Sequence, residues 1–173
     1  MLQNHLEIKK EEKILLSSLT FEVDNIFFNL RKACKTIRRE LNLLNQENFV
    51  IPKKNSLPTL NEENLKKLVD QMQPHHFLGD EYIIYMLKNE NNNIFKLIKE
   101  YNEYLEKRKY EQEDDNYLGL RGVDEKLAYC IQRLGAMIYH FNIHLNLLNV
   151  LLRNASSTTE TQQAAFKVPG ELH

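Results

Sequence analysis

The sequence predicts an all-α protein, a helical bundle of five or six helices in which two long helices pack together. Two stretches repeat apolar residues at alternating spacings of four and three, which keeps one seam of a helix facing a partner helix. The longer seam comprises Leu127, Ile131, Leu134, Ile138, Phe141, Leu145, Leu148 and Leu152, and the shorter comprises Val23, Phe27, Leu30, Cys34, Ile37, Leu41 and Leu44. Only five glycines and four prolines interrupt 173 residues, which favours long elements.

The first two predicted helices occupy the N-terminal quarter of the chain. A short helix is expected over 9–19, and the hydroxyl residues Ser17, Ser18 and Thr20 then supply caps or a break. The shorter seam predicts a long helix from about Phe21 to Gln46.

The middle of the chain carries start and stop signals for further helices. The segment Thr59–Glu62 fits a capping box, and the helix that it opens is expected to stop at Pro74. Asp80 can cap the next helix, which the asparagines at 91–93 are expected to interrupt before the pattern continues to Gln112.

The C-terminal third is predicted to hold a loop, the longest helix and a tail. The acidic and glycine-containing stretch 113–122 reads as a loop, and the last helix is expected from about Asp124 to Asn154. Residues 155–173 are rich in Ser, Thr and Gln, which is typical of a flexible polar tail. We therefore expect a single helical-bundle domain over 1–154 and a tail over 155–173.

Composition narrows the class of protein and its compartment. The formal net charge of −1 gives no overall attraction to nucleic acid or to anionic membrane. Two cysteines do not form a disulfide framework, so a reducing, cytoplasmic location is expected. The N-terminus lacks a basic start followed by an apolar run, and the most apolar window, 141–152, is too short and too polar to span a bilayer.

The last helix is apolar over more than its seam. A helix with so wide an apolar surface is either central to a bundle or half of an oligomer interface, and the sequence leaves both open. The candidate interface residues are Met137, Phe141, Ile143, Leu147, Val150 and Leu151. Gly135 lies inside the same helix, where its usual purpose is the close approach of another helix or of a bulky side chain.

Arg133 and His140 are the one candidate catalytic pair. They lie seven apart and project from the same side of the helix, two turns apart. An arginine followed by a histidine after four to six residues is similar to the motif of HEPN ribonucleases, small helical enzymes of toxin and defence systems. That resemblance implies RNA cleavage by the pair across a dimer. The chain departs from the motif at Leu134, where a polar residue is usual, and in placing the pair deep inside a helix.

Five basic residues within nine positions form a candidate nucleic-acid-binding stripe on the second predicted helix. They are Arg31, Lys32, Lys35, Arg38 and Arg39. Such a stripe can neutralise phosphates, but it can equally be solvated or pair with the acidic stretches at 100–106 and 111–115.

No pattern for a metal, a cofactor or a nucleophile reaches the same strength. His140 and His144 are one helical turn apart, but zinc needs further ligands, for which His75 and His76 are the candidates. The chain has no glycine-rich phosphate loop and no serine beside a catalytic histidine or acid. We therefore expect neither a metal nor a cofactor.

These observations favour a non-enzymatic module for protein–protein interaction or assembly, which self-associates through its long C-terminal helix. Its partner would be another protein or a second copy of the chain. The alternative is a helical protein that acts on nucleic acid, either an RNA binder that uses the basic stripe or a HEPN-like ribonuclease that uses Arg133 and His140.

Overall fold

The computed structural model describes the backbone of residues 2–46, 56–73 and 81–171, and the side chains of 7–46, 56–73 and 81–154. Over these residues the protein is all-helical and contains no strand, as the sequence predicted. The helices are α1 (Leu2–Leu44), α2 (Asn64–Asp70), α3 (Glu81–Glu113) and α4 (Tyr117–Glu171). The described part of the chain thus holds four helices rather than five or six.

Two expected breaks do not occur, which accounts for the lower number. In α1 the hydroxyl of Thr20 donates to the carbonyl of Leu16 at 2.8 Å, so it is satisfied inside the helix. Leu16 and Leu19 are buried on either side of the serines. In α3 the first asparagine of the triplet, Asn91, is itself buried. Burial of the flanking side chains therefore outweighs the local preference of Ser, Thr and Asn for helix ends.

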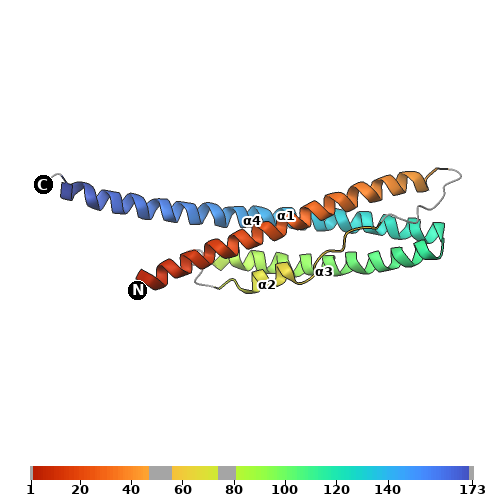
Figure 1. Ribbon diagram of the computed structural model, residues 1–173, viewed down its shortest axis with the longest axis horizontal. Helices are drawn as coiled ribbons and strands as arrows, with labels where there is room; N and C mark the ends of the chain where they lie inside the picture. Colours follow the sequence, from red (N-terminus) through yellow and green to blue (C-terminus); the bar gives the residue numbers. More distant parts are fainter. Residues whose placement is uncertain (1, 47–55, 74–80, 172–173) are drawn as a thin grey trace.

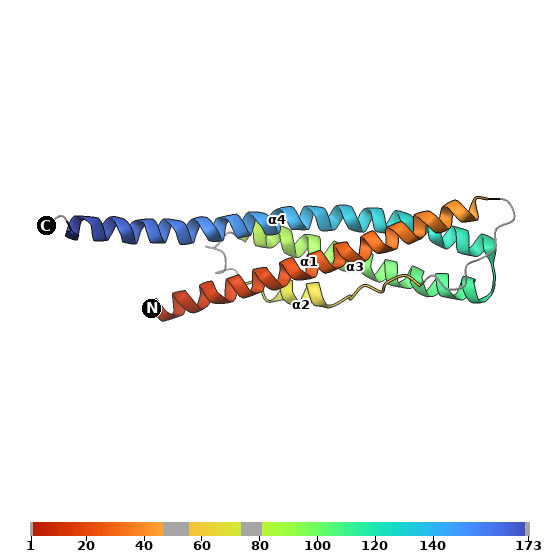
Figure 2. The ribbon, with the colours of Figure 1, turned by 45° about the horizontal axis from the view of Figure 1, so that its top comes forward.

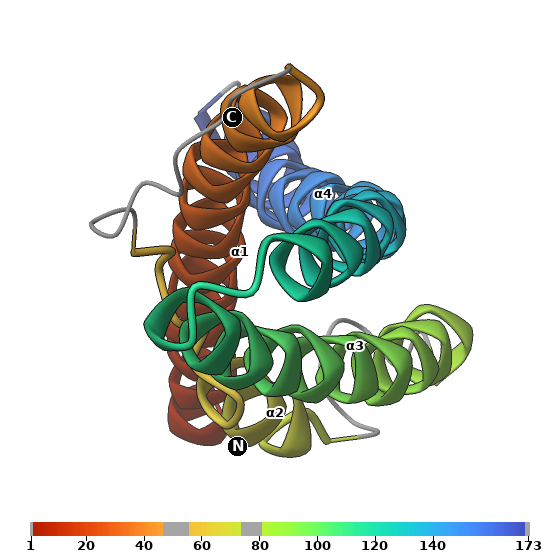
Figure 3. The same ribbon diagram turned by 90° about the vertical axis from the view of Figure 1, so that its right-hand side faces the viewer.

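Three long helices lie along the length of the molecule (Figure 1). α1 and α3 run in one direction, and α4 returns antiparallel to both, in contact with each of them (Figures 1 and 2). The short α2 packs against α1 and α3 on the side away from α4 (Figure 3). Because α4 contacts both other long helices, it needs a wide apolar surface within a single chain.

The core lies between the three long helices. All eight residues of the longer seam are buried, from Leu127 to Leu152. In the shorter seam Val23, Leu30, Ile37 and Leu44 are buried, and the other three residues are partly buried against the same core. Each seam thus faces the protein interior.

The segment before α2 is held against α3 by side chains of α3. Asn102 accepts a hydrogen bond from the backbone N–H of Leu60 at 3.2 Å and donates to the carbonyl of Leu60 at 2.9 Å. The hydroxyl of Tyr101 donates to the carbonyl of Pro58 at 2.8 Å, and burial raises the pKa of Tyr101, which keeps this donor protonated. The segment's buried backbone groups are therefore satisfied without a strand or a helix.

The ends of the helices differ in detail from the sequence prediction. α2 begins at Asn64. The side chain of Asn61 accepts hydrogen bonds from the backbone N–H groups of Glu63 and Asn64 at 2.9 and 3.0 Å, and this replaces the expected capping box. α4 begins at Tyr117, earlier than expected, because Asn116 caps it by accepting from the N–H of Gly119 at 3.1 Å. The predicted loop over 113–122 is therefore reduced to a tight turn.

α4 also ends later than predicted. Its backbone is helical as far as Glu171, whereas the sequence predicted a polar tail from residue 155. The division into a domain over 1–154 and a tail over 155–173 stays a prediction. None of the described helices is both long enough and apolar enough to cross a membrane.

Candidate functional site

A cluster of three charged side chains joins the three long helices inside the bundle. Arg108 of α3 donates from Nε to Oδ1 of Asp124 of α4 at 3.0 Å, and a second guanidinium nitrogen donates to Glu40 of α1. Arg108 is 3% exposed, and neither acid has any exposed surface. Solvent and substrates have no access to this cluster, so its role is to fix how the helices pack.

The two acids of this cluster share one arginine. Burial, hydrogen bonding to Glu40 and the charge of Glu40 raise the pKa of Asp124, whereas Arg108 lowers it, and the net result is a pKa of about 8. Asp124 thus keeps its proton at neutral pH. One oxygen of each acid, Oε1 of Glu40 and Oδ2 of Asp124, is buried without a donor from the described residues. The proton that Asp124 retains is available to bond to Glu40.

This cluster was not predicted from the sequence, although a signal for it was present. Glu40 lies three residues after Ile37 of the shorter seam, and Asp124 lies three before Leu127 of the longer one. Residues three apart share a helix face, so both acids had to turn toward the interior. A charged residue on a buried face requires a buried partner of opposite charge.

α4 carries a second row of residues with the same spacing as its buried seam, on the opposite side. We call this row the outer seam; its members are Tyr129, Arg133, Ala136, His140, Ile143, Leu147, Val150 and Asn154, and all are exposed. Its apolar part is nearest the C-terminal end, where Ile143, Leu147 and Val150 are 46%, 45% and 48% exposed. Nothing in the described chain covers this row.

The six residues predicted to form an interface are therefore divided by the structure. Ile143, Leu147 and Val150 lie in the outer seam. Met137 and Leu151 are partly buried against the core, and Phe141 is completely buried in it. Phe141 stabilises the monomer and does not belong to an exposed surface.

The candidate catalytic pair also lies in the outer seam. Arg133 Nη1 is 3.6 Å from Oε2 of Glu100 of α3, and its guanidinium lies 5.4 Å from the ring centroid of Tyr129. His140 meets the ring of Tyr139 edge-on, with 6.0 Å between centroids. Both side chains are exposed on one face of one helix. No other histidine or arginine of the described residues contacts Arg133 or His140.

All five residues of the basic stripe are exposed on α1. Arg31, Lys32, Lys35, Arg38 and Arg39 make no ion pair with any described residue. The acidic stretches of α3 thus do not neutralise them within the described chain. The stripe is an exposed cationic surface that no described residue neutralises.

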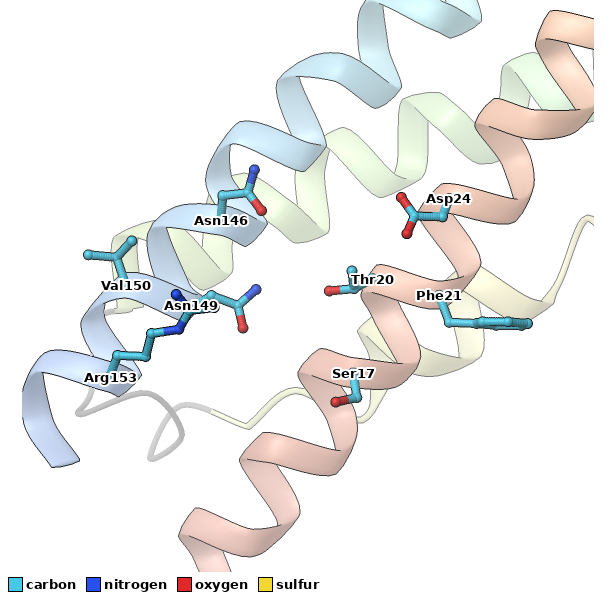
Figure 4. A pocket seen from close by; sticks show the side chains of 8 residues that line it. All are labelled: Ser17, Thr20, Phe21, Asp24, Asn146, Asn149, Val150 and Arg153. Carbon is cyan, nitrogen blue, oxygen red and sulfur yellow. The ribbon is translucent and has the colours of Figure 1, made fainter.

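An open groove separates α1 from α4 near the N-terminal half of α1 (Figure 4). It has a volume of about 610 Å³ and is lined by Ser17, Thr20, Phe21, Asp24, Asn146, Asn149, Val150 and Arg153. The Thr20 hydroxyl and the Asn149 amide bond to carbonyls of their own helices, at 2.8 and 3.3 Å. No nucleophile in the groove stands beside a general base, so the groove offers binding surface and no evident chemistry.

His144 and the two cysteines lie in contacts within the bundle. His144 Nδ1 lies 2.9 Å from Oε1 of Glu90, and the described residues contain no group of three metal-ligating side chains. The other two candidate ligands, His75 and His76, lie outside the described residues. Cys34 and Cys130 are both free, and burial raises the pKa of Cys130 to about 11, which disfavours the reactive thiolate.

The described residues therefore provide two free surfaces, the outer seam and the basic stripe, and one enclosed ionic cluster. Neither surface has the enclosed pocket that small-molecule sites use. In comparison with known proteins, the chain matches no family model, no curated protein and no solved structure.

Proposed function

We propose that this chain is a non-enzymatic helical interaction module that associates with a second copy of itself through the outer seam of α4. The observation that supports the proposal is a row of exposed apolar side chains: Ile143, Leu147 and Val150 follow one another at spacings of four and three and are about half exposed. Apolar residues at this spacing are the pattern by which a helix packs on another helix. A solvated helix face does not require apolar side chains in such a row.

The apolar side chains give the association its driving force. Ile143, Leu147 and Val150 are each about half exposed, so each leaves apolar surface in contact with water. Burial of such side chains against a partner removes apolar surface from water, which is the main favourable contribution in protein association. In a twofold dimer each outer seam would pack against its own copy.

The internal packing and the location are parts of the same proposal. The two buried seams have the mean spacing of 3.5 residues that left-handed, coiled-coil-like packing requires, and we infer this geometry between α1 and α4. The two free cysteines fit a reducing compartment, so a cytoplasmic location is inferred.

The test is the mass of the full-length chain in solution, measured by analytical ultracentrifugation over a range of concentrations. We expect a dimer, and we expect Ile143→Glu together with Leu147→Glu to give a monomer. Both positions are exposed, so the fold should be kept. The matched control is Tyr82→Glu with Tyr85→Glu on α3, which are 70% and 66% exposed and lie outside the outer seam. A wild-type monomer, or a dimer that survives the α4 substitutions, would reject the proposal.

A second candidate function is action on RNA, and one observation favours it. Arg133 and His140 both belong to the outer seam, so a dimer formed through this seam would bring the pairs of two copies to one interface. Cleavage of labelled RNA that disappears in His140→Ala would support a ribonuclease. Salt-sensitive retention of uncleaved RNA, lost when Lys35 and Arg38 are changed to Gln, would support an RNA binder. Absence of both results would reject the second candidate.

A further inference from the structure

The face of α1 that points away from the core carries three large apolar side chains in a single row. Ile14, Phe21 and Phe28 are spaced seven residues apart and are 59%, 72% and 65% exposed. A spacing of seven deviates from two full turns by only about 20°, so the three side chains lie nearly on one line. The line is about 21 Å long, at about 1.5 Å per residue. The core of this chain makes no use of these three side chains.

The same line continues into exposed cations. Lys32, Lys35 and Arg39 follow Phe28 at helical spacing, and Lys10 precedes Ile14 by one turn. None of the four has an ion pair with a described residue. We call the row formed by Ile14, Phe21, Phe28, Lys32, Lys35 and Arg39 the crest of α1.

Two acids of α1, Glu7 and Glu11, are exposed before the crest begins, and Glu7 precedes Ile14 by seven residues and so lies on the same line. Glu12, Glu22 and Glu40 are buried. Asp24 lines the groove on the α4 side of the helix (Figure 4). Phe21 points away from α4 in the same view. Between Ile14 and Arg39 the crest therefore combines apolar and cationic groups, with one exposed carboxylate, Asp24, at its edge on the α4 side.

We propose that the crest of α1 docks on an anionic lipid surface. Phe21 and Phe28, with Ile14, enter the boundary between headgroups and acyl chains, and the cations contact lipid phosphates. Apolar anchors combined with Lys and Arg are the composition by which helices bind at the surface of a membrane without crossing it. The attraction of basic residues to anionic headgroups supplies the second contribution.

The width of the crest favours a flat partner over another helix. A partner helix contacts two adjacent rows, because its side chains fit between those of the first helix. The positions that would form the second row beside Phe21 are Ser17, Ser18, Asp24 and Asn25, all polar. A planar surface, by contrast, touches a cylinder along one line, and the apolar residues follow such a line.

The length of the crest favours lipid over nucleic acid. Phosphates of a nucleic acid would engage Lys32, Lys35 and Arg39, but Phe21 lies about 16 Å from Lys32 along the helix axis and Ile14 lies farther still. These two side chains would then have no role. A lipid surface engages the anchors and the cations at once.

Docking on lipid uses a different face from the proposed self-association. In Figure 4 Phe21 of the crest and Val150 of the outer seam project to opposite sides of the groove between α1 and α4. A change in one surface thus leaves the other intact, and the two proposals can fail separately.

Sedimentation of the full-length chain with vesicles tests the proposal. Vesicles of phosphatidylcholine alone are compared with vesicles in which about a third of the lipid is phosphatidylserine. We expect binding to the anionic vesicles only, with a partition coefficient that falls as salt increases. Changing Lys32, Lys35 and Arg39 to Gln should lower the partition coefficient by about fivefold per residue, roughly a hundredfold for all three. Phe21→Ser together with Phe28→Ser should lower the partition coefficient by about tenfold or more.

The matched control removes the same charge from another face. Lys96, Lys109 and Lys126 are exposed on α3 and α4, and their change to Gln should leave vesicle binding within about twofold of wild type. Equal binding to both kinds of vesicle, equal loss in the control variant, or no binding at low salt would overturn the proposal. Retention of poly(U) RNA by the crest cations, with no vesicle binding, would overturn it in favour of a nucleic-acid surface. The Ile143→Glu, Leu147→Glu variant should still bind the vesicles if only self-association is abolished.

Discussion

Arg108 donates a hydrogen bond from Nε to Oδ1 of Asp124, at 3.0 Å, across the interface of α3 and α4, with almost no access to water. The same arginine also bonds to Glu40 of α1, which lies 68 residues away in the chain. A single side chain thus connects the three long helices. Apolar seams allow a helix to slide or rotate, whereas a buried ion pair is satisfied in one arrangement only.

Replacing Arg108 by Met should strongly destabilise the protein. The substitution leaves Glu40 and Asp124 buried without their cation, and loss of one partner from a buried ionic network typically costs about 3–5 kcal/mol. The measurement is the free energy of unfolding in urea. Arg121→Met is the control, because Arg121 pairs with Glu125 at 3.3 Å on the surface and should cost less than about 1 kcal/mol. Equal costs for the two variants would contradict the assigned role of the cluster.

The stability of the fold should depend on the protonation of Asp124. Burial raises the pKa of Asp124 from 3.8 to about 8, so between these values the folded chain holds a proton that the unfolded chain has released. The folded state then binds more protons than the unfolded state, and the contribution of Asp124 to stability falls as pH rises through this window. Below about pH 4 this contribution is complete, and above about pH 8 it has been lost.

Asp124→Asn isolates that effect, because an amide of the same shape cannot ionise. Relative to wild type, the variant should gain stability steadily from pH 5 to pH 8, as measured by urea unfolding at each pH. Asp70→Asn serves as control, since Asp70 is exposed and pairs with Lys66 only at 3.9 Å. If the stability difference between Asp124→Asn and wild type stays constant across this range, Asp124 does not retain its proton.

Removing the side-chain amide of Asn102 should loosen the segment before α2. Asn102→Leu leaves both the N–H and the carbonyl of the buried Leu60 without a partner. Unsatisfied buried groups of this kind cost about 1–3 kcal/mol each. The loss should appear in the free energy of unfolding and in faster amide exchange at Leu60. Asn92→Leu, at an exposed position of α3, should change neither quantity by a comparable amount.

Gly135→Ala should stabilise the protein by about 0.5–1 kcal/mol, because alanine favours the helix and restricts the unfolded chain. The sequence suggested that this glycine permits a close approach, but a Cβ placed there meets nothing within 4 Å. Gly119→Ala is the contrasting variant, because its Cβ would collide with Glu111 and Asn116 unless their side chains move. Thermal unfolding of both variants tests the difference. A destabilising Gly135→Ala would indicate that this position is covered in the assembled protein.

Periodicity was sufficient to predict that the chain is all-helical and which residues of α1 and α4 are buried. The longer seam from Leu127 to Leu152 is buried at every position, because apolar residues that recur every 3.5 positions share one helix face, and that face must be removed from water. Local signals were less informative. The hydroxyl residues of α1 and the asparagines of α3 predicted ends, yet both helices continue, because burial of the residues around them outweighs the local preference.

The candidate surfaces could be predicted only in part. Phe141 and Ile143 are both apolar and lie two residues apart, yet one is in the core and the other is half exposed. The spacing places Phe141 in the longer seam, but whether another helix covers Ile143 depends on where α1 and α3 lie around α4. Phe28 likewise differs from its neighbour Phe27 only in direction: Phe27 packs against the core and Phe28 is 65% exposed on the crest.

The sequence by itself determined that the chain forms helices and which face of each turns inward, because both follow from the spacing of residues along a helix. Only the tertiary structure decided that Glu40, Arg108 and Asp124 meet, that no described residue covers the outer seam of α4, and that the basic stripe of α1 makes no ion pair with a described residue. These features depend on which helices are neighbours and in what register. Contacts between residues far apart in the chain set that register, and no local pattern encodes it.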